Sequence, residues 1–435
     1  MHRFWRLISI CLALGLIATT TARGEEPSSV KNEDELVRVV VLSRHGVRSP
    51  TQSPETLSAW STRTWPQWPV QRGLLTRRGA VLTSAMWENL RLRFVRAGLN
   101  LTPEQVFVRA DVDQRTQATA RALLDGLHLP STPFAVSTGK LDPLFHPVKA
   151  GKCAFDAQSV RDEVLRQAGG SLEHLTRELE EPLRRISDLV APVSPALCQK
   201  WKLPPDCALA DIPGVIEVRA DEHAVNLQGG LAIASSLAEI FLLEYAEWPD
   251  KLSAWGQANE AVLRQILPVH NKIFDLVNRT PAVAGPRGSA LLHEMAAALA
   301  GAHVDSRVNQ ARLTVFVGHD TNISNIGGLL GINWQLPEQG NSAIPPAGIL
   351  ALELRQKQAK QEIRIMFCAQ SLRTMHGWTE ADPLAEAAPI CVPARLTSGE
   401  MALYTADAFS QLVQSAVRSQ CVPEETELMR KQADL

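Results

Sequence analysis

The sequence predicts an α/β fold: a mostly parallel central sheet flanked by helices, with a mainly α-helical domain inserted into the chain. Short runs rich in β-branched residues alternate with longer runs of helical periodicity. From about residue 155 to 280, strand-like runs become scarce and helical patterns follow one another. The 435 residues, 45% of them hydrophobic, are enough for a large core and for more than one domain.

Six segments have the composition of β-strands. The first and fourth are densest in β-branched residues, which is typical of central strands in a parallel sheet. The segments are 36–43, 105–111, 133–138, 312–320, 348–354 and 363–369.

Helical patterns fill the intervals between these strands. We expect helices over 76–98 and 115–126, with Gly98 and Gly126 as their C-terminal caps. In the middle region, residues 227–247 carry an apolar helical face. Residues 259–279 repeat that style, with Pro268 as a kink or boundary.

These patterns predict an α/β domain in two parts around an insertion. The first part covers 25–154, the α-helical domain covers 155–280, and the second part covers 281–435. Residues 1–24 have a basic start, an apolar stretch too short for a confident membrane span, and small residues near Gly24. They predict a secretory signal peptide, against the alternative of a buried N-terminal helix. We therefore expect an exported, periplasmic protein without a stable membrane anchor.

Removal of the signal peptide leaves six cysteines, and an even number in an exported chain suggests three disulfides. Cys198 and Cys207 flank a Pro-Pro loop that is short enough to be closed locally. Spacing alone does not determine the other two pairings. The net charge of -2 gives no general attraction to nucleic acid, so no nucleic-acid partner is expected.

Charged residues gather where the predicted strands end. Arg44, His45 and Arg48 follow the first strand, and Gly46 between them allows close approach of a ligand. In open α/β sheets, ligands bind beyond the carboxyl ends of the strands. Two neighbouring guanidiniums repel each other unless an anion lies between them, and their planar forks match phosphate oxygens.

Two further strand ends repeat this design. His319 and Asp320 end the fourth strand segment, at the start of a helix, where free N–H groups favour an anion. Arg115 lies at the start of another helix, after the second strand. The three ends together predict a site for a phosphate ester.

The same residues carry a family resemblance that extends over nearly all of the mature chain. The R-H-G-x-R-x-P motif, the distant H-D pair and the segments "ADVDQRTQATA", "DPLFHPVKAGKC" and "GHDTNISNIGGLLGINWQLP" resemble the histidine acid phosphatases, a branch of the histidine phosphatase superfamily. Its bacterial phytases and glucose-1-phosphatases are especially similar. The resemblance implies an α/β domain and an α-helical domain with the site between them.

The resemblance also implies roles for individual residues. His45 would be the nucleophile and Asp320 the proton donor, while further groups would hold the phosphate and the substrate. No metal or cofactor is implied, and we expect a monomer. The implied phosphate-binding residues are Arg44, Arg48, Arg115 and His319, the substrate-binding residues Thr51 and His270, and the disulfides Cys153–Cys421, Cys198–Cys207 and Cys368–Cys391.

The implied chemistry is consistent with the residues themselves. Attack by His45 on phosphorus would form a phosphohistidine and divide one difficult step into two. Attack requires neutral imidazole, and the neighbouring guanidiniums should depress the pKa of His45. Asp320 must be protonated to donate to the leaving oxygen, which favours acid pH.

The preferred substrate is open. Gly46 after His45 is typical of the phytase branch, whereas Gln52 stands where phytases usually carry a substrate-binding lysine. We expect a phytase-like acid phosphomonoesterase, with a glucose-1-phosphatase or another sugar-phosphate phosphatase as the alternative. A phosphoglycerate mutase, a zinc hydrolase and a catalytically inactive phosphate-ester-binding protein are other classes. The signal peptide, the absence of an H-E-x-x-H motif, and the presence of both His45 and Asp320 argue against them in turn.

Overall fold

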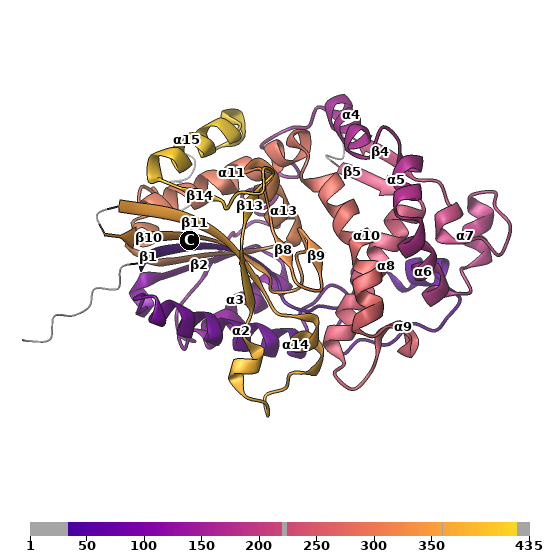
Figure 1. Cartoon of the computed structure of the whole chain (residues 1–435), viewed down its shortest axis with the longest axis horizontal. Helices are drawn as coiled ribbons and strands as arrows, with labels where there is room; N and C mark the ends of the chain where they lie inside the picture. Colours follow the sequence, from indigo (N-terminus) through magenta and orange to yellow (C-terminus); the bar gives the residue numbers. More distant parts are fainter. Residues whose placement is uncertain (1–33, 220–223, 359, 424–435) are drawn as a thin grey trace, which may run out of the picture. The chain divides into compact units, whose positions relative to one another are not determined.

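The computed structural model describes residues 34–219, 224–358 and 360–423, all within one compact unit (Figure 1). The predicted signal peptide, residues 1–24, lies outside the described residues. Among the helices that are described, none combines the length and apolar character needed to cross a membrane.

The central sheet has a parallel half and an antiparallel half. In the parallel half the strand order is β3 (Ala135–Val136), β2 (Val106–Ala110), β6 (Leu313–Gly318) and β1 (Glu35–Arg44). Beyond β1 the antiparallel half comprises β10 (Ile349–Lys357), β11 (Lys360–Ala369), β12 (Ile390–Pro393) and β14 (Leu403–Tyr404).

The α/β class with flanking helices is confirmed, but the sheet is mixed. The parallel pairing expected for most of the sheet holds for β1, β6, β2 and β3, whereas β10, β11 and β12 pair antiparallel. The connection explains the difference: β10 ends at Lys357 and β11 begins at Lys360. A parallel crossover needs a dozen or more residues, so this connection requires an antiparallel hairpin.

Helices cover both faces of the sheet. Alternate residues of β1 point to opposite faces, so its apolar side chains pack against helices on both. Val39 and Val41 belong to a core shared with α2 (Arg77–Arg96) and α3 (Gln114–Gly126). Val40 and Leu42 belong to a second core, shared with α11 (Pro281–Ala300), α13 (Asp320–Leu329) and α15 (Ala406–Ala416). The β1 strand is therefore buried on both sides, as its composition predicts.

The region between the two parts of the sheet is largely helical and has its own hydrophobic core. That core also includes Leu57 and Leu82, which lie N-terminal to this region, so the boundaries predicted at 154 and 280 stay predictions. A hairpin of β4 (Val215–Arg219) and β5 (Ala224–Gln228) was not predicted. The helices are α4 (Ala157–Gln167), α5 (Leu172–Glu178), α6 (Glu180–Val190), α7 (Pro195–Lys200), α8 (Gly230–Glu247), α9 (Ser253–Gly256) and α10 (Glu260–Asn278).

Shorter elements complete the described fold. They are the helices α1 (Pro54–Trp60), α12 (Ser306–Gln310) and α14 (Leu372–Gly377) and the two-residue strands β7 (Ile332–Asn333), β8 (Gln335–Leu336), β9 (Gly340–Asn341) and β13 (Arg395–Leu396).

One of the two predicted glycine caps holds, and the other is wrong for a physical reason. Gly98, after α2, has the left-handed φ of 87° expected at a C-terminal cap. Gly126 is instead the last residue within α3, where a Cβ would lie 2.2 Å from the carbonyl oxygen of Ser84. Its small size permits close packing of α3 against α2. Pro268, predicted as a kink or a boundary, lies inside α10, which continues to Asn278; the boundary is therefore excluded and the kink stays a prediction.

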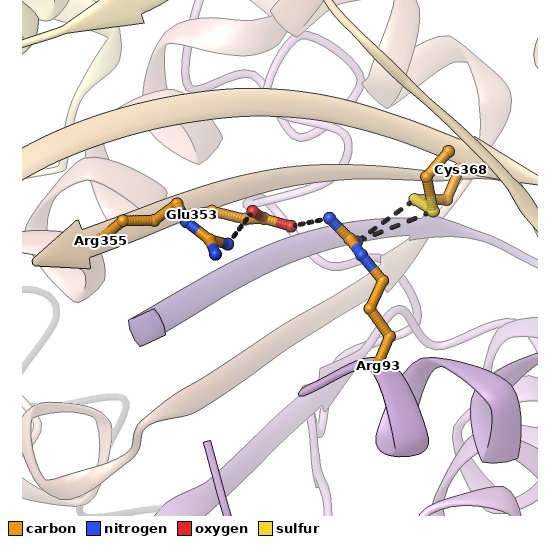
Figure 2. The surroundings of a disulfide bond; sticks show 5 residues. Arg93, Glu353, Arg355 and Cys368 are labelled. Atoms are coloured by element: carbon orange, nitrogen blue, oxygen red, sulfur yellow. Dashed lines mark hydrogen bonds and ion pairs between the residues drawn. A yellow bond between two sulfur atoms is a disulfide. The ribbon is translucent and has the colours of Figure 1, made fainter. Parts of the chain in front are cut away.

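The structure contains the three disulfides that the resemblance implies: Cys153–Cys421, Cys198–Cys207 and Cys368–Cys391. The last joins β11 to β12. Figure 2 shows Arg93 of α2 reaching this disulfide, with its Nη1 3.8 Å from the Cys368 sulfur. Arg93 also pairs with Glu353 of β10 at 2.6 Å, so one side chain ties a helix to two strands.

Candidate active site

The site is built where β1 and β6 end side by side. Arg44 is the last residue of β1 and has no exposed surface. The backbone N–H of His45 donates to the carbonyl of Gly318, the last residue of β6, at 3.1 Å. This contact brings His45 close to His319, and their ring centroids are 5.7 Å apart.

His45 is held as a neutral imidazole with a defined tautomer. Its Nδ1 lies 2.9 Å from the carbonyl oxygen of Gly46, which can only accept, so Nδ1 carries the proton. The other nitrogen, Nε2, then keeps its lone pair. Burial lowers the pKa of His45 well below its ordinary value, and the guanidiniums of Arg48 and Arg44 lower it further. The side chain is thus suited to nucleophilic attack.

Carboxylates balance the buried arginines. Arg44 forms ion pairs with Glu239 of α8 and with Asp320, the latter at 2.9 Å. Arg48 lies 3.7 Å from the same Glu239 carboxylate. Arg115, at the start of α3, pairs with Asp113 at 2.5 Å. Three guanidiniums therefore surround His45 without a large excess of positive charge.

His319 joins this cluster through both ring nitrogens. Its Nδ1 lies 3.3 Å from Nη2 of Arg115, and its Nε2 lies 2.7 Å from Oδ2 of Asp111. The same Asp111 oxygen lies 2.8 Å from Nε2 of His146. Burial alone would raise the pKa of Asp111, but hydrogen bonds from His146 and His319 hold it well below its usual range. Asp111 is therefore a buried carboxylate between two imidazoles.

Asp320 begins α13 directly after His319. Burial would raise the pKa of its carboxyl group, but the guanidiniums of Arg44 and Arg48 lower it below the ordinary value. In the substrate-free site Asp320 is therefore ionised in mild acid.

The two substrate-binding candidates lie in different surroundings. Nε2 of His270, on α10, lies 3.6 Å from Glu239, so His270 borders the arginine cluster through that carboxylate. Thr51 is exposed on the loop after β1. A Cβ on Gly73 would lie 3.6 Å from Thr51 and 3.9 Å from Arg115, so a single loop position borders both residues.

The structure thus brings Arg44, His45, Arg48, Arg115, His319 and Asp320 together, and it adds partners that sequence reasoning missed. Asp111 ends a predicted strand and Asp113 follows it, two residues before Arg115. This closeness in sequence could have identified both as site residues. Glu239 is one of three glutamates within the apolar helical pattern, and no local signal in the sequence distinguishes it from Glu244 and Glu247. His146 gave no local signal. The missed residues are Asp111, Asp113, His146 and Glu239.

Asp111, His146 and His319 also form a group of potential metal ligands, with ligand atoms within 4.8 Å of one another. Zinc ligands surround a point about 2.0–2.1 Å from each nitrogen. Here both Nε2 atoms instead approach one oxygen at 2.7 and 2.8 Å, which are hydrogen-bond lengths. The geometry is that of a hydrogen-bonded triad, and no step below uses a metal.

The chain is similar to known phosphatases over most of its length. Phytase AppA of Escherichia coli is 35% identical over 365 residues, covering 80% of this chain and 83% of that protein. A glucose-1-phosphatase of Salmonella typhimurium is 29% identical, covering 73% and 74%. The structure of a Hafnia alvei phytase in complex with myo-inositol hexakis sulphate is 33% identical, with a TM-score of 0.81, covering 90% of this chain and 100% of that chain.

The model of the histidine phosphatase superfamily (branch 2) matches residues 35–368, which include each phosphate-site residue described above. A match over most of the chain, together with the R-H-G motif at the end of β1 and the H-D pair at the end of β6, identifies the family. This chain belongs to the histidine phosphatase superfamily, branch 2.

Proposed function

We propose that the chain is an acid phosphomonoesterase that acts through a phosphohistidine at His45, with inositol phosphates as its principal substrates. The observation that carries this proposal is the state of His45. It is buried, its Nδ1 is bound to the Gly46 carbonyl, and the positive charges of Arg48, Arg44 and Arg115 add to burial in lowering its pKa.

In the first half-reaction, Nε2 of His45 attacks phosphorus in line with the leaving oxygen, and the P–O bond to the alcohol breaks. Charge on the equatorial oxygens is stabilised by the guanidiniums of Arg44, Arg48 and Arg115. Water then attacks the phosphohistidine, releases inorganic phosphate and restores the imidazole.

Asp320 is proposed to give its proton to the leaving oxygen, although it is ionised when no substrate is bound. A bound phosphate ester brings its own negative charge to Arg44 and Arg48. Like charge nearby raises a carboxyl pKa, so substrate binding favours protonation of Asp320. The proton would then be available where the alkoxide develops.

Substrate choice depends on residues that surround the phosphate site. The similarity to phytases supports inositol phosphates as substrates. Gln52 carries no charge where phytases usually have lysine, which favours glucose-1-phosphatase or another sugar-phosphate phosphatase as the second candidate. We assign Thr51 and His270 to substrate binding, because each borders the arginine cluster.

Export to the periplasm is proposed from the predicted signal peptide, and the three disulfides agree with an oxidising compartment. We propose a monomer that uses no nucleic-acid partner.

The test is hydrolysis of a small panel at mildly acid pH: inositol hexakisphosphate, glucose 1-phosphate and p-nitrophenyl phosphate. Acid quench of a reaction with labelled substrate should leave label on the protein, and peptide mapping should locate it at His45. Turnover without trapped label under single-turnover conditions would reject the phosphohistidine, and no turnover of any ester would reject the phosphatase.

A further inference from the structure

His146 lies beside His319 of the phosphate site, with the two ring centroids 5.3 Å apart. It lies on the segment that follows β3, and its Nε2 is 2.8 Å from Oδ2 of Asp111. Asp111 is fully buried, whereas the His146 side chain keeps 21% of its surface exposed. The hydrogen bond therefore ties a surface-facing imidazole to a carboxylate in the interior.

Asp111 has limited freedom to move. Its Oδ1 accepts the backbone N–H of Val112 at 2.8 Å, and its Oδ2 accepts from both His146 and His319. Because two N–H groups fix Oδ2 from different sides, the carboxylate has a defined orientation. A carboxylate held in this way fixes in turn the imidazole that donates to it.

The imidazole fixed by Asp111 is that of His319. With Nε2–H bound to Asp111, the opposite nitrogen Nδ1 is aimed toward Arg115, at 3.3 Å. This is the side on which the bound phosphate would lie. The orientation of Nδ1 therefore depends on the hydrogen bonds made at the far side of the ring.

We infer that His146 is a positioning residue that, through Asp111, holds His319 in the orientation required to bind the transferred phosphoryl group. This inference rests on the proposed function, because it concerns the same phosphate site.

Burial lowers the pKa of His319, and the hydrogen bond to Asp111 opposes that effect. Two donors share one oxygen of Asp111, so each receives less of its negative charge. Without His146, the Asp111 carboxylate would bind only His319. Its negative charge would then favour the protonated form of the His319 imidazole. The charged and titratable groups that face His319 are Asp111, Asp113, Arg115, His146, His45 and Asp320.

The experiment compares His146→Leu with His146→Gln. Gln can place an N–H donor near the position of Nε2, and Leu cannot. We expect His146→Leu to lower kcat/KM for p-nitrophenyl phosphate by about tenfold, the lower part of the 10–100-fold range for groups that orient a functional histidine. His146→Gln should restore most of that loss. His293→Leu, at an exposed histidine of α11, is the matched control.

The pH profile provides a readout that a merely structural role would not move. In His146→Leu the alkaline limb of kcat/KM should shift to higher pH, because His319 retains its proton longer, and His146→Gln should shift it back. Equal profiles for the three proteins, or a loss that Gln does not rescue, would overturn the inference.

Imidazole ¹⁵N NMR of the wild-type protein gives a second measurement that does not depend on a variant folding. We expect His146 to carry a proton on Nε2, bound to Asp111. A His146 with an unprotonated Nε2 contradicts the inference even where the wild type hydrolyses phosphate esters, whereas a wild type that hydrolyses none refutes the proposed function instead.

Discussion

The two walls of the site differ in how the chain builds them. One wall consists of strand ends, where Arg44, His45 and His319 are fixed by the backbone of β1 and β6. The other comes from the helices α8 and α10, which supply Glu239 and His270. We assign phosphoryl chemistry to the strand ends and charge balance to the helical side, while substrate choice involves both, through Thr51 on the loop after β1 and His270 on α10.

The difference is physical as well as functional. Parallel strands set their ends in register, so a site on them is positioned by the sheet's own hydrogen bonds. Helical side chains reach the site across a packed core, and their positions depend on that packing. We therefore expect substitutions at strand ends to change the chemical step, and substitutions on the helical side to change stability.

The largest effect is expected at the end of β1. His45→Ala should lower turnover on the order of 10⁶-fold, the scale seen when a covalent nucleophile is removed. Circular dichroism and the melting temperature should stay close to those of wild type, because the substitution deletes a side chain from a site and not from the core. Normal phosphatase activity in His45→Ala would show that another residue is the nucleophile.

The next effect tests the end of β6. Asp320→Asn keeps the size and polarity of the side chain but cannot transfer a proton. The loss in phosphoenzyme formation should approach the upper part of the ~10²–10⁴-fold range for alkyl esters, and should be clearly smaller for p-nitrophenyl phosphate, whose phenolate leaves without help.

Single-turnover measurements are required for this comparison, because dephosphorylation is common to all substrates and would mask the difference. Equal losses on the two kinds of ester would show that Asp320 serves charge balance with Arg44 and not proton donation.

The same division explains what the sequence could predict. β1 and β6 are dense in β-branched residues, and the charged residues at their ends are adjacent in sequence, so local patterns were sufficient. Glu239 meets Arg44 across 195 positions, and His146 meets Asp111 across 35. No local pattern specifies such contacts, since they depend on how separate elements pack.

Errors in the predicted elements also arise because contacts between separate elements are not visible in local sequence patterns. β12 and β14, which were not predicted, contain four and two residues, too few for a period of two to be recognised. Gly126 was assigned to a cap on its residue type, while its actual role is the close approach of α3 to Ser84. In each case tertiary contacts decide what local propensity leaves open.

The third prediction concerns Glu244, a buried carboxylate of α8 that forms no ion pair with an arginine within the described part of the chain. Glu244 accepts a hydrogen bond from the Ala254 N–H at 3.0 Å, and burial raises its pKa to about 7. In the unfolded chain a glutamate loses its proton near pH ~4.3. Between these pH values the folded protein binds more protons at Glu244 than the unfolded chain does. The free energy of unfolding therefore falls as pH rises toward 7.

Glu244→Gln removes this titration and can still accept the Ala254 hydrogen bond. The free energy of unfolding is measured with urea for both proteins. The value for Glu244→Gln minus the value for wild type should increase by about 2–3 kcal/mol as pH rises from about 5 to 7. Glu181→Gln, at an exposed position of α6, should show no such trend. A constant difference between Glu244→Gln and wild type across this range would contradict the assignment.

The smallest expected effect sharpens the question of substrate. Gln52 lies on the loop after β1, beside the exposed Thr51, and Gln52→Lys restores the charge that phytases usually carry there. An exposed charge pair contributes about 0.2–1 kcal/mol, so KM for inositol hexakisphosphate should fall by about fivefold at most. KM for p-nitrophenyl phosphate should not change, because its single phosphate is already held by the arginines. Raising the salt concentration should reduce the fall in KM, since exposed charges are screened.

Gln361→Lys adds the same charge near the start of β1, at the opposite end of that strand from His45, and should change neither KM. An equal fall in KM for both substrates would place Gln52 in the phosphate site itself, and no change for either would remove this loop from substrate selection.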